Sequence, residues 1–243
     1  MDIRGKTALV TGAAKRVGRQ IALDLAAKGA DILIHYRESR AEAESLASEI
    51  RALGRNAAVF AADLTKAADI QKMTAAIFKK FPSVDILVNS ASLFYKTPLE
   101  NVTEADWDKL LDANLKGPFL LSREIGIKMS QGKGGKIVQI ADWSGFRPYK
   151  DYAPYCVSKG GLLTLTKSLA RDLAPKVLVN AVAPGPVLPP PDMTDAEKVA
   201  IAKSTLLGRW GDPADVANAV IFLLENDFIN GAVLVVDGGR SVS

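Results

Sequence analysis

The sequence predicts an α/β fold built on a parallel sheet, and two observations support this prediction. Short apolar segments alternate with longer amphipathic segments along almost all of the 243 residues, which is the pattern of repeated strand–helix–strand units. No linker or internal repeat divides the chain, so a single domain with a substantial buried core is expected.

Seven segments have the length and the Val, Ile and Leu content of buried strands. The first, TALVTG, ends at a glycine, and the last, AVLVVDGG, ends in a pair of glycines. In chain order they are residues 7–12, 31–36, 56–63, 85–91, 135–142, 176–185 and 232–239. Because helical patterns separate most of them, the strands are expected to be parallel and joined by right-handed crossovers.

The segments between these strands have helical periodicity. Val17, Ile21 and Leu25 recur every four residues and therefore share one helix face. The other helical segments are residues 39–54, 66–81, 104–129, 152–174 and 213–226. Residues 186–205 are the exception, because they are rich in proline and contain no strand pattern. Long irregular segments in compact domains are usually functional, so we expect a substrate loop there.

Composition and charge exclude several classes of function. The net charge of +4 comes from scattered basic residues without interleaved aromatic side chains, so no nucleic-acid partner is expected. No apolar run approaches the roughly 20 residues of a bilayer span, and the N-terminus lacks a signal-peptide pattern, so we expect a cytoplasmic protein without a membrane partner. With only Cys156 and His35, neither an internal disulfide nor a multi-histidine metal site is expected, and Cys156 is expected to be a small, partly buried side chain.

Tyr155 and Lys159 form the first candidate for chemistry. They lie four residues apart in a helical segment, which places both side chains on one helix face. An ammonium beside a phenol favours the phenolate, so we expect the pKa of Tyr155 to fall below its usual value of about 10. Such a tyrosine would donate a proton near neutral pH. Asp142 stands thirteen residues before it, at the end of the strand segment 135–142.

The turn TGAAKRVG, between the first strand and the first helix, predicts a site for a pyrophosphate group. Backbone N–H groups at a helix N-terminus suit an anion. Gly12 and Gly18 allow a tight turn and a close approach of the backbone to the ligand.

The end of the second strand predicts which dinucleotide binds. Enzymes that use NAD commonly carry an acidic residue there, on the ribose 2′-hydroxyl. This chain has Tyr36 and Arg37, followed by Ser39 and Arg40, and a cation with hydroxyl groups suits a 2′-phosphate. NADPH is therefore predicted, although Glu38 in the same segment leaves the strictness of the preference open.

Several segments together resemble the short-chain dehydrogenase/reductase family over essentially the whole chain. They are TGAAKRVG, the DL of AADLT, the NSA of LVNSAS, the N of DANLKG, YCVSK, APGP and VDGG. The resemblance implies a single Rossmann-type, doubly wound domain over residues 1–243 with a seven-stranded parallel sheet. It also implies a homotetramer, with helices around residues 103–130 and 152–174 in the main interface.

The resemblance implies roles for individual residues. Tyr155 would be the acid/base and Lys159 would also bind the nicotinamide ribose. Asn114 would hold a kinked helix and a proton-relay water, and Asp142 completes the catalytic set. The candidate cofactor-binding residues are Gly12, Lys15, Arg16, Val17, Gly18, Tyr36, Arg37, Ser39, Asp63, Leu64, Asn89, Ser90, Ala91, Tyr155, Lys159, Pro184, Gly185 and Val187.

Two positions depart from the usual family pattern. Arg16 replaces the middle glycine of the phosphate turn, and Asp142 replaces the catalytic serine. Counting along the strand 135–142 places the serine position at 142, not at Ser144. Both departures resemble the pteridine reductases and dihydromonapterin reductases, as do HYRES and NSASLFYKTPL. That subgroup implies a substrate site whose members are Arg16, Ser92, Phe94, Asp142 and Tyr155, with the phenyl ring stacked on a pterin.

The chemistry of Asp142 favours the same substrate. An ionised carboxylate repels the charge that develops on a ketone oxygen, whereas it accepts hydrogen bonds from the N–H groups of a pterin. We therefore predict NADPH-dependent reduction of a dihydropterin, with Tyr155 as proton donor. The alternatives are a 3-ketoacyl thioester or general carbonyl reductase of the same family, and a non-enzymatic NADP(H)-binding regulator. Trp143, Tyr149 and Trp210 are further candidates to shape the pocket.

Overall fold

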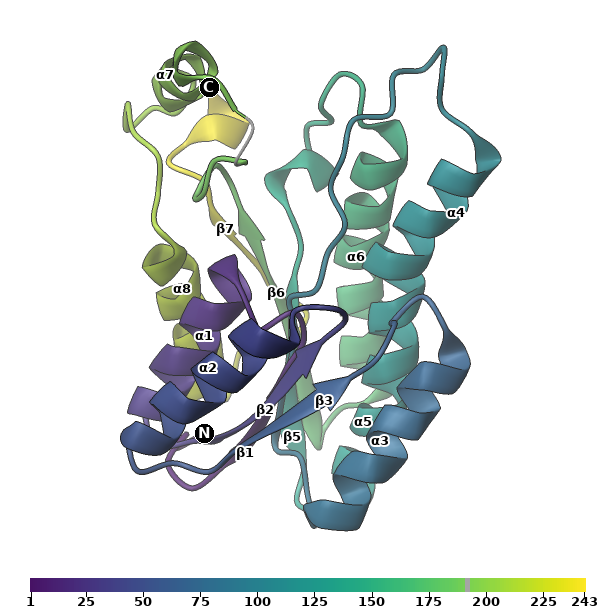
Figure 1. Cartoon of the computed structure of the whole chain (residues 1–243), viewed down its shortest axis with the longest axis vertical. Coiled ribbons are helices and arrows are strands. Elements are labelled where there is room, and N and C mark those ends of the chain that lie inside the picture. Colours follow the sequence, from purple (N-terminus) through teal and green to yellow (C-terminus); the bar gives the residue numbers. More distant parts are fainter. Residues whose placement is uncertain (191–192) are drawn as a thin grey trace.

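The computed structural model describes residues 1–190 and 193–243. It confirms the predicted α/β fold, because seven strands form one parallel sheet in the order β3-β2-β1-β4-β5-β6-β7 (Figure 1). The strands are β1 (Thr7–Val10), β2 (Asp31–Tyr36), β3 (Ala57–Ala61), β4 (Ile86–Asn89), β5 (Gly135–Ile140), β6 (Val177–Pro184) and β7 (Val233–Val236).

The helices connect the strands in the predicted places. The principal helices are α1 (Arg16–Ala27), α2 (Arg40–Ala52), α3 (Ala67–Lys80), α4 (Glu104–Leu111), α5 (Gly117–Gln131), α6 (Ala153–Asp172), α7 (Asp195–Lys203) and α8 (Pro213–Glu225). Single 3₁₀ turns follow β5 at Trp143–Gly145 and β7 at Arg240–Val242.

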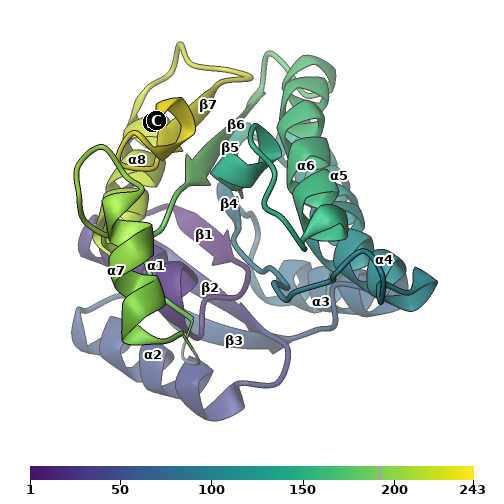
Figure 2. The same cartoon turned by 90° about the horizontal axis from the view of Figure 1, so that it is seen from above.

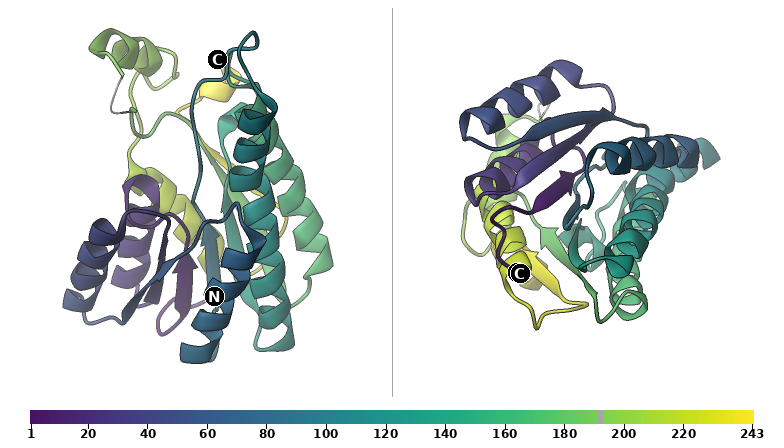
Figure 3. Two further views of the ribbon diagram at one scale, coloured as in Figure 1. Left: turned by 45° about the vertical axis from the view of Figure 1, so that its right-hand side comes forward. Right: turned by 90° about the horizontal axis from the view of Figure 1, so that it is seen from below.

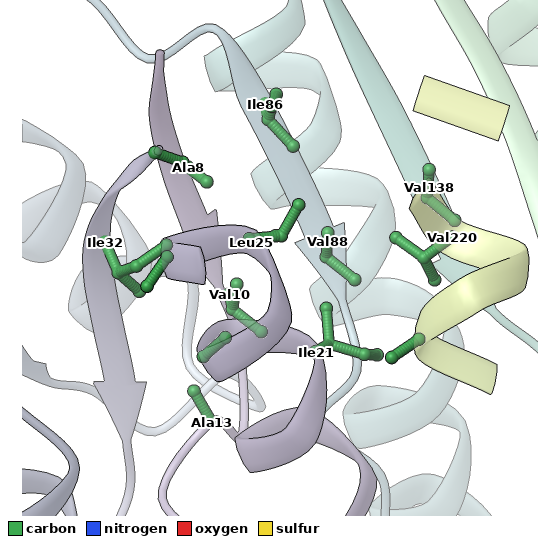
Figure 4. Close-up of a cluster of buried hydrophobic side chains, with 14 of the residues drawn as sticks. Ala8, Val10, Ala13, Ile21, Leu25, Ile32, Ile86, Val88, Val138 and Val220 are labelled. Carbon is green, nitrogen blue, oxygen red and sulfur yellow. The ribbon is translucent and has the colours of Figure 1, made fainter. Parts of the chain in front are cut away.

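Helices cover both faces of the sheet (Figure 2). One apolar cluster lies between the sheet and α1, α2 and α8, and a second lies between the sheet and α3, α5 and α6. In the first cluster, Ile21 and Leu25 of α1 lie beside Val10 and Val88 of the central strands (Figure 4). Burial of each such side chain stabilises the fold by roughly 1.5–3 kcal/mol.

The strand order reverses between β1 and β4, and this reversal determines where a ligand can bind. The chain leaves β1 towards β2 on one side, while β4 pairs with the other side of β1. The helices that follow the two strands therefore lie on opposite faces, which opens a crevice at the carboxyl ends of the strands. The helix α7 and the C-terminus lie towards one end of the molecule and the N-terminus towards the other (Figures 1 and 3).

Two segments differ in detail from the sequence prediction. The single helical pattern at 104–129 is two helices, α4 and α5, joined by a π-helical turn at Asp112–Lys116 that contains Asn114. The segment 186–205 contains α7, whose start is fixed by a reciprocal capping box between Thr194 and Glu197. Residues 191–192 of this predicted loop lie outside the described residues.

Within residues 1–190 and 193–243, no helix combines the length and the apolar character needed to cross a membrane. In the same residues, no group of three or more His, Cys, Asp and Glu side chains is placed to hold a metal ion. Cys156 is buried, and its Sγ accepts a hydrogen bond from the backbone N–H of Tyr149 at 3.3 Å.

Candidate active site

A cavity of about 660 Å³ opens at the carboxyl ends of the strands. This volume is within the range of about 300–1,000 Å³ that is typical of sites for small molecules and cofactors. Most of the residues predicted from the sequence line it together. They are Gly12, Lys15, Arg16, Val17, Gly18, Tyr36, Arg37, Ser39, Asp63, Leu64, Ser90, Ala91, Ser92, Phe94, Asp142, Tyr155, Lys159, Pro184, Gly185 and Val187.

Asn89 and Asn114 lie behind the lining of this cavity. The Asn89 side chain is buried and donates a hydrogen bond to Ser122 Oγ at 2.9 Å. Asn114 Oδ1 accepts from the backbone N–H of Leu93 at 2.7 Å, and its Nδ2 donates to the carbonyl of Leu93 at 2.9 Å. The π-helical turn presents Asn114 to this segment, so Asn114 fixes the path of the chain between Ser92 and Phe94.

The phosphate turn after β1 depends on its two glycines. Gly12 has a positive φ of 62°, and a Cβ atom there would lie only 2.8 Å from the Cα atom of Ala91. A Cβ atom on Gly18 would lie 2.5 Å from the Gly12 carbonyl oxygen. Among the described residues, no side chain caps the N-terminus of α1, so its first N–H groups remain available to an anion.

His35 holds this turn, which the sequence did not indicate. Its ring is buried, and Nδ1 accepts the backbone N–H of Gly12 at 3.1 Å. Because Nδ1 is an acceptor, we assign the proton to Nε2, which donates to the carbonyl of Ala62 at 3.1 Å. Burial lowers the pKa of His35 to about 4, so the imidazole is neutral at physiological pH.

The backbone conformation of Arg16 is one that glycine adopts more easily than other residues. Its φ is +54°, in the left-handed region that costs a residue with a side chain roughly 1–2 kcal/mol. The guanidinium offsets part of this cost, because Nη2 donates to the carbonyl of Leu188 at 2.9 Å and Nη1 donates to that of Pro189 at 3.4 Å. Arg16 thereby links the phosphate turn to the segment predicted as the substrate loop.

Two cations in the part of the cavity that is predicted to bind adenosine are already paired. Arg37 forms an ion pair with Glu38 at 3.0 Å, and Lys15 forms one with Glu42 at 2.7 Å. Both pairs are exposed and therefore weak, so a phosphate can displace either carboxylate at low cost. Glu38 thus neutralises part of the positive charge of Arg37 that would favour NADPH. This pairing explains why the sequence left the strictness of the preference open.

Asp142 is the centre of a hydrogen-bonded group at the end of the cavity that is predicted to be catalytic. Its Oδ2 accepts the hydroxyl of Tyr155 at 3.0 Å, and its Oδ1 accepts the hydroxyl of Tyr149 at 3.2 Å. Oδ1 also accepts the backbone N–H of Ser144 at 2.7 Å, which caps the 3₁₀ turn after β5. Ser144 itself is completely buried and does not line the cavity, as the strand register predicted.

The predicted lowering of the Tyr155 pKa is wrong for this structure. Burial raises the pKa of Tyr155 well above its usual value, and the negative charge of Asp142 raises it further. Lys159 is also buried; its Nζ donates to the carbonyl of Ile140 at 2.9 Å and lies 5.7 Å from the centre of the Tyr155 ring. Burial lowers the pKa of Lys159 to about 8, so desolvation outweighs the attraction that the spacing of the pair suggested.

Aromatic rings line the same part of the cavity as Asp142. Phe94 is 45% exposed and stacks on Tyr152 with ring centres 4.7 Å apart and an angle of 9° between the planes. The edge of Phe94 also meets Tyr155 at 4.8 Å, and Trp143 packs against Tyr149 at 5.2 Å. Tyr152 was missed in the sequence, although it lies three residues before Tyr155 in a segment rich in aromatic residues.

Comparisons with known proteins agree with this arrangement. Residues 12–241 match the family model described as enoyl-(acyl carrier protein) reductase. The chain is 36% identical over 241 residues to the 3-oxoacyl-[acyl-carrier-protein] reductase FabG of Staphylococcus aureus (strain Mu50), covering 96% of this chain and 97% of that protein. It is also 36% identical over 247 residues to the 2-dehydro-3-deoxy-D-gluconate 5-dehydrogenase of Pseudoalteromonas atlantica (strain T6c), covering 98% and 96%.

A solved structure gives the same result for the fold. The blue fluorescent protein from a metagenomic library, solved in complex with NADPH, superposes with a TM-score of 0.91 at 32% identity and covers 99% of both chains. The two named relatives act on different substrates at equal identity, so overall identity does not select the substrate.

Proposed function

The chain belongs to the short-chain dehydrogenase/reductase family, and on that premise we propose that it reduces a flat nitrogen heterocycle of the pterin type. The protein is an NADPH-binding oxidoreductase with a Rossmann-like fold. We propose its substrate class and the roles of its individual residues.

The residues of the cavity fit NADPH. The cradle formed by Gly12 and Gly18 has no room for a Cβ atom, and the N-terminus of α1 points unpaired N–H groups at it. Arg37 and Ser39 line the cavity and would hold the 2′-phosphate, and Lys159, whose Nζ lies 5.7 Å from the centre of the Tyr155 ring, would bind the nicotinamide ribose. When bound, NADPH supplies the hydride.

The observation that supports a pterin is the pair of hydroxyl groups held by Asp142. Tyr149 and Tyr155 both donate to this carboxylate, so the position that usually offers a donor to the substrate offers an acceptor instead. A pterin has ring N–H and amino donors that complement such an acceptor. The exposed ring of Phe94 supplies a surface for stacking a flat heterocycle, as in aromatic pairs generally.

The same geometry supports Tyr155 as the source of the proton. In the reduction of a C=N bond, hydride adds to carbon and the nitrogen takes a proton. Tyr155 keeps its proton at neutral pH, because its pKa is raised, and can deliver it to nitrogen. The resulting phenolate faces the ammonium of Lys159, which favours its formation in the transition state and so offsets the cost that burial imposes.

Carbonyl reduction of a 3-oxoacyl thioester is the second candidate. The names of the curated relatives support it more directly than they support pterin reduction. Tyr155 and Lys159 would serve a ketone equally well. Asp142 would then have to carry a proton itself, since only a donor stabilises the charge on the carbonyl oxygen.

Oxidation of NADPH at 340 nm separates these candidates. The protein is offered a dihydropterin, dihydrofolate and an acetoacetyl thioester, and Asp142→Ser and Asp142→Asn are compared with Asp108→Asn, which removes an exposed carboxylate on α4. We expect turnover of the pterin to fall about 10²-fold or more in both Asp142 variants and to be unchanged in the control. Thioester turnover that improves in Asp142→Ser would establish the second candidate instead.

The remaining predictions concern regulation, assembly and location. Tight NADPH binding without turnover of any substrate class would support the NADP(H)-binding regulator. The homotetramer stays a prediction, supported by the exposed apolar side chains of α4, α5 and α6, namely Trp107, Phe119, Ile127 and Val157. Light scattering at micromolar concentration tests it. The cytoplasmic location also stays a prediction.

A further inference from the structure

Arg240 lines the part of the cavity that is proposed to bind the substrate, and no motif in the sequence pointed to this residue. It follows β7 and two glycines with positive φ, Gly238 and Gly239. The carboxylate of Asp237 accepts the backbone N–H groups of Gly239 at 2.8 Å and Ser241 at 2.7 Å, which fixes the turn. Arg240 therefore enters the cavity from a firmly hydrogen-bonded turn.

The segment after β5 holds the same turn from the other side. Arg147 donates from Nη1 to the backbone carbonyl oxygens of Ser241 at 3.3 Å and Ser243 at 2.5 Å. The guanidinium of Arg240 then lies 4.9 Å from the centre of the Trp143 ring. Stacking on an aromatic face restricts the planar group without using its N–H donors.

The other cations that line the cavity have partners. Lys15 and Arg37 form ion pairs, Arg16 donates to the carbonyl oxygens of residues 188 and 189, and Lys159 donates to that of Ile140. Within residues 1–190 and 193–243, the Arg240 guanidinium has no hydrogen-bond or ion-pair partner, and it lies over the ring of Trp143. It is thus the cation whose donors remain available.

The position of Arg240 assigns it to the substrate instead of the cofactor. The phosphate turn and the 2′-phosphate position lie at the ends of β1 and β2, in one half of the sheet. Arg240 follows β7 and contacts Trp143 after β5, in the other half. Tyr149 donates to Asp142 and packs against Trp143, the ring over which Arg240 lies. Burial raises the pKa of Tyr149, the charge of Asp142 raises it further and that of Arg240 lowers it, so the cation acts on a residue bound to Asp142.

We propose that Arg240 binds an anionic group of the substrate, a carboxylate or a phosphate on the part of the molecule that lies away from the reacting bond. The guanidinium presents parallel N–H donors that match either anion in a two-point contact. The inference deepens the proposed function, since it assigns negative charge to the substituent of the heterocycle. The same chemistry would hold the phosphate of an acyl carrier if the substrate were a thioester.

The test compares matched pairs of substrates that differ in charge. Dihydrobiopterin is paired with dihydrofolate, and the acetoacetyl thioester of N-acetylcysteamine is paired with acetoacetyl-coenzyme A. In Arg240→Gln we expect KM for the charged member of the active pair to rise about 10- to 100-fold, while kcat and the KM of the neutral member change less than about twofold. Arg240→Lys should recover part of the loss.

Controls separate recognition of charge from support of the fold. Arg171→Gln removes an exposed cation from the last turn of α6 and should leave both members unchanged. The KM of the unaltered protein for the charged member should rise with salt, which needs no variant at all. Equal changes for both members, or no change for either, would show that Arg240 only packs on Trp143 and would overturn the inference.

The failure of the proposed function looks different. Activity confined to the thioester pair would refute pterin reduction and still decide the inference on that pair. If neither pair is turned over, the NADP⁺-bound protein is titrated with pyrophosphate, because the cofactor then occupies the phosphate turn. Pyrophosphate binding that Arg240→Gln does not weaken would overturn the inference.

Discussion

The cofactor end and the substrate end of the cavity are built from different materials. At the end predicted to bind the cofactor, the turn after β1 presents backbone N–H groups, and Lys15 and Arg37 are already paired with neighbouring carboxylates. At the substrate end, side chains from separate segments meet: Phe94 after β4, Tyr155 on α6, and Arg240 after β7.

This difference shows which functions a sequence fixes locally. A turn between consecutive elements needs only glycines in the right order, so its ligand is common to many proteins. A cavity wall built from loops that are distant in the sequence changes whenever one loop changes, so its ligand is specific to a few proteins. Substitutions at one end should therefore leave ligand binding at the other end unchanged.

The largest expected effect comes from Tyr155→Phe. Removal of the hydroxyl that donates to Asp142 should lower kcat by about 10²- to 10⁴-fold, because the proton donor is lost. The dissociation constant for NADPH, measured by calorimetry, should change less than about threefold. A comparable loss of NADPH binding would break the separation between the two ends.

The next largest effect is a pH dependence of stability from His35, at the cofactor end. The folded protein holds the ring neutral with its pKa at about 4, whereas the unfolded chain protonates it near 6.5. Its stabilising contribution is therefore complete above about pH 6.5 and is lost as the pH falls towards 4, by roughly 3 kcal/mol.

Urea unfolding at a series of pH values measures this contribution. His35→Gln has no ring to protonate, so its free energy of unfolding should fall less over the same window. Parallel curves for the two proteins would contradict the assignment. The activity of His35→Gln at pH 7 should also fall, mainly because NADPH binds more weakly once the N–H of Gly12 has lost its acceptor, Nδ1 of His35.

A smaller effect is expected at the substrate end, in the pH profile of kcat/KM. Lys159 loses its charge near pH 8, so the rate should be level below that pH and fall about tenfold per pH unit above it. The charge of Asp142 supports that of Lys159, so Asp142→Asn should move the fall to lower pH. A fall that stays in place would mean that another group limits the rate.

The smallest effect is expected for Arg16→Gly, which lies where the two ends meet. Glycine relieves the left-handed backbone but gives up two hydrogen bonds to the 186–190 segment, so we expect stability to change by less than about 1 kcal/mol. Hydrogen exchange at Val187 and Leu188 should nevertheless accelerate. Arg19→Gln, which breaks an ion pair between α1 and Glu49 of α2, should leave that exchange unchanged.

The fold and the cofactor end were predictable because each element announces itself locally. Strand and helix patterns gave all seven strands, and TGAAKRVG gave the turn that Gly12 and Gly18 require. The pKa of Tyr155 was not predictable, because burial depends on the packing of α6 against the rest of the chain and outweighs the nearby lysine.

The contacts missed at the site share one physical cause. His35 meets Gly12, and Arg240 meets Trp143, only after the sheet has assembled. No periodicity or turn signal records a pair of residues that lie 23 or 97 positions apart in the sequence. Short-range patterns predict the elements, whereas such pairs depend on the tertiary arrangement.

The π-helical turn at Asp112–Lys116 adds one residue to an otherwise regular helix. Such a turn holds one residue more than the α-helix around it, and each α-helical residue turns the chain by about 100°. Because the wider turn absorbs the extra residue, α4 and α5 keep the register of one continuous helix, and the backbone path changes only inside the turn. Asn114 lies in this turn and binds both backbone groups of Leu93. Deleting Leu115 should therefore disturb the contact between Asn114 and Leu93 and leave the outer surfaces of α4 and α5 in place, so one amino acid of additional length serves the wall of the cavity alone.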